Sequence, residues 1–104
     1  MVQGKVVYTT DKDGRYTWIC KGVESISGYT QEELIGKSAF DLIYPDDLPA
    51  VTARFVEPIE TEVYREESFR VVDKDGSVVK ILSRSIRKPD GTILGVFDRR
   101  EQDR

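Results

Sequence analysis

Turns that end in Asp-Gly separate β-rich runs along this chain, and they constrain its fold more than any other feature. Asp-Lys-Asp-Gly occupies residues 11–14 and 73–76, and Lys-Pro-Asp-Gly occupies residues 88–91. Glycine tolerates a positive φ and aspartate hydrogen-bonds to its own backbone, so these turns favour β-hairpins. The flanking runs are rich in β-branched and aromatic residues, and they predict the following strands: 6–10, 16–20, 64–72, 78–86 and 92–97.

The middle of the chain predicts helices. Thr30 and Glu33 have the spacing of a capping box, and Gly36 can end that helix in a left-handed conformation. A second helix is predicted over about residues 46–57, with Asp46 as its N-cap. Helical spacing directs an apolar face of this helix toward the sheet, and that face includes Val51, Phe55 and Val56.

The order of two strands, short helices and three strands (ββ-ααα-βββ) predicts an α+β fold. In it, one five-stranded antiparallel sheet carries short helices packed on one face. The length of 104 residues suits a single domain, residues 1–104. Apolar pairs at 78–79 and 81–82 place aliphatic side chains on both faces of one strand. Aliphatic neighbours in a central strand and a dimer surface explain these pairs equally well.

Missing residue types exclude most catalytic chemistry. The chain has no His, and Cys20 is its one cysteine. These absences remove Ser-His-Asp and Cys-His arrangements, His-ligated metal or haem, and an intrachain disulfide. Gly-Lys-Ser at 36–38 resembles the end of a P-loop, but Gln31 stands where that motif requires its first glycine. We therefore expect a domain that is not an enzyme.

Two remaining features have both a structural and a chemical explanation. The acidic pairs at 32–33 and 46–47 suit helix capping better than a metal or catalytic site, because neighbouring helical residues point in different directions. Cys20 ends an apolar run, where a buried thiol is commoner than a reactive one.

Charge and hydropathy restrict the partners and the location. A net charge of −3 argues against a nucleic-acid partner. No apolar run has the roughly 18 residues of a membrane span, so no direct membrane contact is expected. A single cysteine is compatible with a domain in the reducing cytoplasm. This holds even if the parent protein is anchored to a membrane.

The motifs in chain order resemble the PAS domain family, also called the sensory box. Residues 28–36 read G-Y-T-Q-E-E-L-I-G and resemble the family's G-Y-[ST]-x-E-E-L-I-G. Residues 40–47 read F-D-L-I-Y-P-D-D and resemble its F-x-D-L-I-H-P-D-D. Residues 69–76 resemble its F-R-x-x-x-K-D-G stretch, and residues 95–98 resemble its final strand. The resemblance covers residues 5 to 101 and implies a PAS-like fold.

The departures from the family pattern restrict which kinds of PAS domain this chain can resemble. Cys20 replaces the family's Asn, Tyr44 replaces its usual His, and Asp98 is followed by two arginines in place of the usual Ile-Thr. The cysteine of flavin-binding photoreceptors is missing from residues 36–40, and no His can ligate a haem. We therefore expect neither a cysteinyl-flavin nor a His-ligated haem cofactor.

The resemblance implies a regulatory module of a longer protein, such as a histidine kinase or diguanylate cyclase of a two-component system. Such a module binds a small ligand in its core cavity, dimerises, or both, and controls a covalently linked effector. The alternative is a ligand-free homodimerisation or docking module, for example of a transcription regulator. Asp98 is the expected relay residue, and residues 98–104 can begin a connecting helix. The candidate ligand-binding residues are Trp18, Cys20, Val51, Arg54, Phe55, Ile81, Ser83, Ser85 and Phe97.

Two assignments within this set have competing explanations. Ser83 and Ser85 share one face of their strand, and alternation slightly favours a solvent-facing position for them, with Leu82 and Ile86 filling the core. Arg54 can pair with an anionic ligand at a pocket mouth, although an arginine on a helix more often faces solvent.

Overall fold

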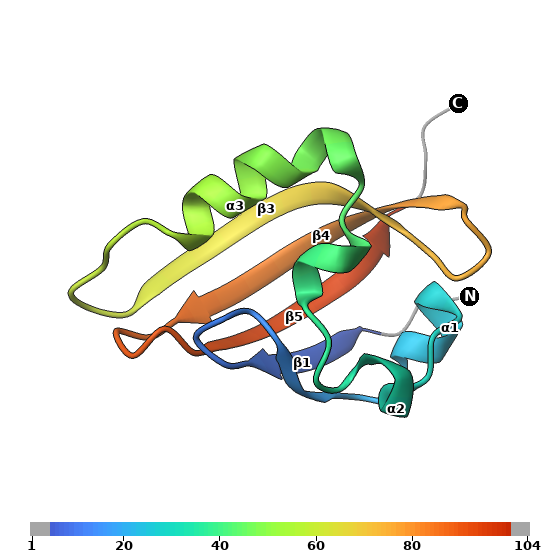
Figure 1. The fold of residues 1–104 in the computed structure, drawn as a ribbon, viewed down its shortest axis with the longest axis horizontal. Coiled ribbons are helices and arrows are strands. Elements are labelled where there is room, and N and C mark those ends of the chain that lie inside the picture. The colour runs from blue at the N-terminus through green and yellow to red at the C-terminus, as the bar shows by residue number, and fades with distance from the viewer. Residues whose placement is uncertain (1–4, 101–104) are drawn as a thin grey trace.

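Five antiparallel strands form one sheet in the spatial order β2-β1-β5-β4-β3 (Figure 1). The computed structural model describes residues 5–100. Its strands are β1 Val6–Thr10, β2 Tyr16–Ile19, β3 Val63–Val72, β4 Val78–Arg87 and β5 Ile93–Arg100. The predicted α+β class and the strand order are confirmed, and each predicted strand lies within a few residues of its observed bounds.

The turns form as the Asp-Gly pattern predicts. Gly14, Gly76 and Gly91 adopt φ values of 84°, 89° and 93°, which side chains with a Cβ rarely adopt. Asp11 and Asp73 each accept two backbone N–H groups within their own turns through Oδ1. The repeated Asp-Lys-Asp-Gly therefore reflects shared turn chemistry.

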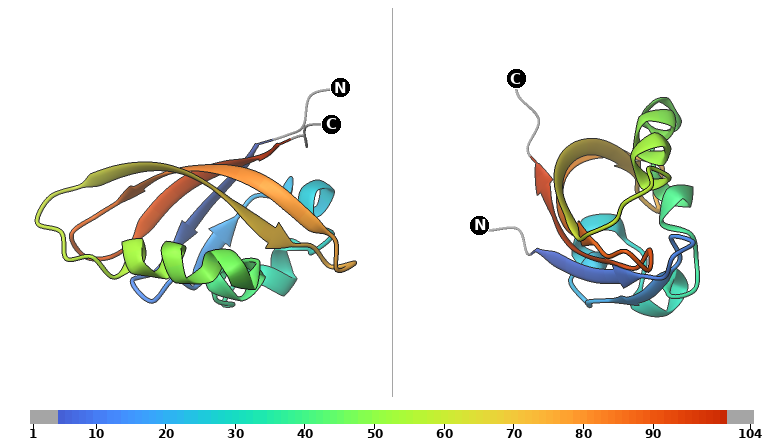
Figure 2. Two further views of the ribbon diagram at one scale, coloured as in Figure 1. Left: turned by 90° about the horizontal axis from the view of Figure 1, so that it is seen from above. Right: turned by 90° about the vertical axis from the view of Figure 1, so that its left-hand side faces the viewer.

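Short helices fill the connection between β2 and β3 and lie on the concave side of the curved sheet (Figure 2). The capping box is confirmed, because Thr30 Oγ1 accepts from the Glu33 N–H and Glu33 accepts from the Thr30 N–H. The helical elements are α1 Val23–Ser27, α2 Gln31–Leu34, α3 Leu48–Phe55 and two 3-10 turns, Ala39–Leu42 and Pro45–Asp47.

The predicted bounds of α3 were too wide. Residues 45–47 form a 3-10 turn, so Asp46 does not cap α3. Asp47 takes the N-cap position without capping through its side chain, which instead binds Arg70 on β3. Val56 lies beyond the last helical residue and is 64% exposed, so its predicted orientation toward the sheet is wrong.

A closed core lies between α1, α2 and the sheet's first two strands. Its fully buried members include Val6, Ile19 and Val23, and Ile26 and Leu34 pack beside them. The Gln31 side chain donates to the Ile19 carbonyl at 3.0 Å and ties α2 to β2. The buried side chains of this core are at most 7% exposed.

The outer face of the sheet is partly apolar. Val78 is exposed there, whereas its neighbour Val79 faces the interior. Leu94, Tyr64 and Trp18 are also large exposed apolar or aromatic side chains. Residues 98–100 continue β5 as strand, and residues 101–104 of the expected connecting helix lie outside the described residues.

Candidate functional site

A cavity of about 110 Å³ lies between α3 and the concave face of the sheet. Its walls are mainly apolar, with contributions from the helical segment, from α3 and from the three C-terminal strands. Representative apolar lining residues are Ile26, Leu34, Phe40, Ile43, Val51, Phe55, Phe69, Ile81, Ile93 and Phe97. A space of this size suits a small molecule, since a cavity of about 150 Å³ holds benzene.

The structure brings seven of the nine predicted ligand residues to this cavity. They come from two sources, with three on α3 and the rest on β4 and β5. The seven lining residues are Val51, Arg54, Phe55, Ile81, Ser83, Ser85 and Phe97. Their role in binding stays a prediction, while their convergence on one cavity is a property of the fold.

Trp18 and Cys20 lie elsewhere, which corrects their predicted placement. The register of β1 and β2 shifts between Thr9 and Thr10, and this irregularity turns Trp18 outward, where it is 46% exposed. Cys20 follows the end of β2, and its Sγ accepts from the Val7 N–H at 3.3 Å. Cys20 thus keeps a side-chain hydrogen bond at the position where the family has Asn.

The two serines face inward, so the solvent-facing alternative is wrong. Ser83 is only 5% exposed, and Ser85 lines the cavity beside it. Leu82, the residue before Ser83, pairs with Asp98 on the outer side of the sheet. Alternation alone left the face undecided because both sets contain apolar residues.

Tyr8 belongs to the site, although sequence reasoning did not find it. Its hydroxyl lies 3.4 Å from Ser83 Oγ, two strands away, because its ring crosses β5 above Gly95. A Cβ at Gly95 would collide with the Tyr8 ring and hydroxyl. Burial, and to a smaller extent the nearby Glu67 carboxylate, raise the pKa of Tyr8, so it stays neutral at physiological pH. The glycine inside a strand was the available signal.

Charged side chains gather at the end of the cavity under α3. Arg54 Nη1 donates to Glu67 Oε1 at 2.7 Å, so Arg54 lies at the cavity and pairs with protein. Arg65 forms an ion pair with Glu57, which follows α3. Arg87 Nη1 donates to the Glu57 carbonyl at 2.7 Å. The alternation of β3 placed Arg65 and Glu67 inward, a pattern that a search for apolar periodicity overlooks.

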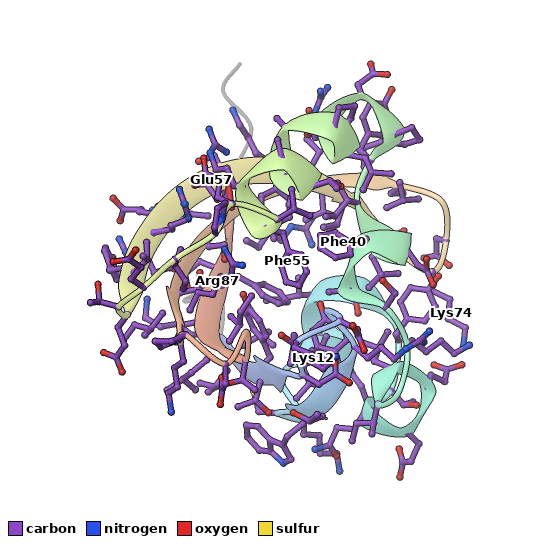
Figure 3. All side chains as sticks on the ribbon, turned by 60° about the vertical axis from the view of Figure 1, so that its left-hand side comes forward. Lys12, Phe40, Phe55, Glu57, Lys74 and Arg87 are labelled. Atoms are coloured by element: carbon purple, nitrogen blue, oxygen red, sulfur yellow. The ribbon has the colours of Figure 1, made fainter. Side chains whose placement is uncertain are left out.

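Aromatic rings border this charged end. Phe40 and Phe55 meet edge to face, with their centroids 4.9 Å apart. The Arg87 guanidinium lies 5.5 Å from the Phe55 ring centroid, a cation–π arrangement. Figure 3 shows these three side chains directed toward the space between α3 and the sheet. The cavity therefore combines an apolar body with one cationic end.

Asp98, the expected relay residue, lies on β5 next to Phe97 of the cavity. It accepts from Lys5 Nζ at 3.1 Å, which links the start of the described chain to its last strand. Among residues 5–100, no group of three or more Asp, Glu or Cys side chains is placed to hold a metal ion. Within the same range, no helix is long and apolar enough to cross a bilayer.

Comparison with known proteins gives consistent results. A family model described as PAS fold matches residues 19–97. The White collar 2 protein of Neurospora crassa is 36% identical over 67 residues, which are 64% of this chain and 13% of the relative. The chain thus spans about an eighth of that relative's length.

Solved structures share the fold at lower identity. A PAS domain of an HTR-like protein from Haloarcula marismortui is similar with a TM-score of 0.77 and 16% identity, covering 92% of this chain and 81% of that one. The N-terminal domain of a diguanylate cyclase with a PAS/PAC sensor from Marinobacter aquaeolei gives a TM-score of 0.75 at 20% identity. That match covers 92% of this chain and 94% of the other.

Proposed function

This chain belongs to the PAS fold family, and from that premise we propose that it is a non-catalytic sensory module. In this proposal a small ligand binds in the cavity and changes the activity of an effector linked to the domain. A diguanylate cyclase or a histidine kinase is the proposed effector class. The cavity is the observation that carries the proposal, because seven residues chosen from sequence converge on it.

The last strand offers a route from the cavity to the outer surface. Phe97 lines the cavity, and Asp98 faces the opposite side of β5, where it binds Lys5. Phe97 directly precedes Asp98 on β5. A ligand that displaces Phe97 would therefore disturb the Asp98–Lys5 ion pair. A ligand shifts such an equilibrium only if it binds the two arrangements unequally.

Ligand binding is tested by native mass spectrometry and an absorption spectrum of the purified protein, followed by thermal shifts with a metabolite panel. We expect a copurifying molecule or a ligand-dependent rise in Tm. Ser83→Leu fills the cavity and should abolish that rise. Ser68→Leu is the matched control, since Ser68 pairs with Leu82 on the outer face. An empty protein without any shift would contradict the proposal.

The alternative is a ligand-free dimerisation or docking module, and the outer face of the sheet supports it. Trp18, Tyr64 and Leu94 are exposed there without covering helices. In this version we expect a homodimer that dissociates to monomers as the protein is diluted, which analytical sedimentation measures. Leu94→Lys should shift this equilibrium toward the monomer. A monomer at every concentration would contradict the alternative for this chain.

The context of the domain is also a proposal. We infer that residues 1–104 are one sensor domain within a longer signalling protein. The small share of the White collar 2 protein that the chain spans supports this reading. We also infer a cytoplasmic site of action, which fractionation of cells that express the tagged parent protein would test.

A further inference from the structure

The register of the sheet brings two arginines together on its concave face. Arg65 on β3 pairs with Ser85, and Arg87 on β4 pairs with Val63, two residues before Arg65. Both arginines line the cavity, as does Thr10, which pairs with Ile93. Ile93 also pairs with Arg87. Arg65, Arg87 and Thr10 therefore lie on neighbouring cross-strand pairs at one end of the cavity.

This end holds hydrogen-bonding groups that the protein does not satisfy. Within residues 5–100, three buried atoms have no hydrogen-bond partner: Nε of Arg65, Nε of Arg87 and Oγ1 of Thr10. Thr10 is 4% exposed. Buried polar groups are nearly always paired, and a charged donor is the costliest to leave unpaired. A ligand whose acceptor atoms reached this end would accept hydrogen bonds from the two Nε–H groups and from the Thr10 hydroxyl.

The charges at this end do not cancel. Glu67 pairs with Arg54, and Glu57 pairs with Arg65. The Arg87 guanidinium donates to two backbone carbonyl oxygens and lies over the Phe55 ring, and it forms no ion pair among the described residues. One guanidinium charge is therefore without a carboxylate, which favours an anionic ligand over a neutral one.

We propose that the cavity binds a small carboxylic acid, with its carboxylate at Arg65, Arg87 and Thr10 and its apolar body among the lining side chains. A planar carboxylate matches the donor geometry of guanidinium groups. The volume of about 110 Å³ limits the apolar body to the size of a benzene ring or a short alkyl chain. This inference rests on the proposed ligand-binding function.

Calorimetric titration of the full chain at pH 7 tests the inference with two pairs of probes. Each pair has one apolar body with two head groups: benzoate against benzyl alcohol, and hexanoate against hexanol. We expect at least one carboxylate to bind about tenfold more tightly than its alcohol, as a charge-assisted contact provides. Equal or tighter binding of the alcohols overturns the carboxylate inference and leaves the ligand-binding function standing. Absence of binding by all four probes overturns the inference, whereas the metabolite panel decides the wider function separately.

Variants then assign the binding to the arginine end. Arg87→Gln should weaken carboxylate binding about tenfold and leave alcohol binding unchanged. Arg84→Gln is the matched control, because Arg84 lies on the same strand but faces outward and pairs with Glu66 at 2.7 Å. Thr10→Val removes a hydroxyl that would donate to the carboxylate while keeping the side-chain shape, so it should also weaken carboxylate binding, and it provides the test if Arg87→Gln does not fold. Unchanged carboxylate affinity in the folded variants would overturn the proposal.

Discussion

The two halves of the sheet's concave face are built from different side chains. Under α1 and α2 the face presents Val6 and Ile19, both fully buried. Under α3 it presents Arg65, Glu67 and Arg87, and no residue of α3 itself is buried. The first half is closed by apolar packing, although Ile26 and Leu34 of its core also line the cavity, and the second half adds ion pairs to the cavity wall.

The difference indicates that one half contributes more to stability and the other more to ligand binding. Apolar burial supplies most of the free energy of folding, and six of the nine buried apolar side chains among the described residues belong to the closed half. Segments with few buried apolar contacts open locally at lower cost, and ligand-binding elements are drawn from such segments. We therefore expect α3 to exchange its amide hydrogens faster than β1 does.

The largest effect should follow from emptying a position in the closed half. Ile19→Ala removes a fully buried side chain, and we expect the free energy of unfolding to fall by about 2–5 kcal/mol in urea titrations. Val56→Ala is the control next to α3, in the half that holds the ion pairs. Val56 is exposed, so its truncation should change the free energy of unfolding by less than about 0.5 kcal/mol. Equal losses in the two variants would remove the distinction between the halves.

Local structure in both halves was the part that the sequence predicted best. Asp-Gly turns, β-branched runs and the Thr30–Glu33 capping box are local signals, and each formed as predicted. Local patterns predict which residues form a strand. They do not predict which face of that strand packs against the core when both faces contain apolar residues. That uncertainty affected Ser83 and Ser85.

The missed parts of the site depend on non-local geometry. Trp18 was displaced by a register shift between β1 and β2, which depends on the pairing partner. Tyr8 reaches Ser83 only because Gly95 lies between them on a third strand. The acidic pair at 46–47 was expected to cap a helix, and the Asp47 carboxylate instead meets Arg70, which is 23 residues away along the chain. These placements depend on strand pairing, strand order and contacts between distant segments, none of which a local pattern contains.

A moderate effect is expected at the border between the halves, where Tyr8 packs against the closed core and lines the cavity. Gly95→Ala forces a methyl group into the Tyr8 ring, and we expect a loss of about 1–3 kcal/mol in the free energy of unfolding. In the Tyr8→Ala background the same substitution should cost much less, so a double-mutant cycle measures the contact. Additive losses would show that Tyr8 does not occupy the space above Gly95.

The smallest effect should come from acid titration of the carboxylate that ties α3 to the sheet. Hydrogen bonds from Arg70 lower the pKa of Asp47, and Arg70 also lies 4.6 Å from the Tyr44 ring centroid. A lowered pKa in the folded state gives a stabilisation that is present above the unfolded value of about 3.9 and lost as the pH falls below it. Asp47→Asn should therefore flatten the fall of Tm between neutral and acidic pH.

A matched variant in the closed half separates a local effect from a general one. Lys74 lowers the pKa of Glu33, so Glu33→Gln should flatten the same acid limb. The two variants should differ in hydrogen exchange. Only Asp47→Asn removes a contact at the start of α3, so only it should accelerate exchange in that helix. If Glu33→Gln accelerated α3 equally, the halves would open as one unit, and the cavity could not admit a ligand independently of the core.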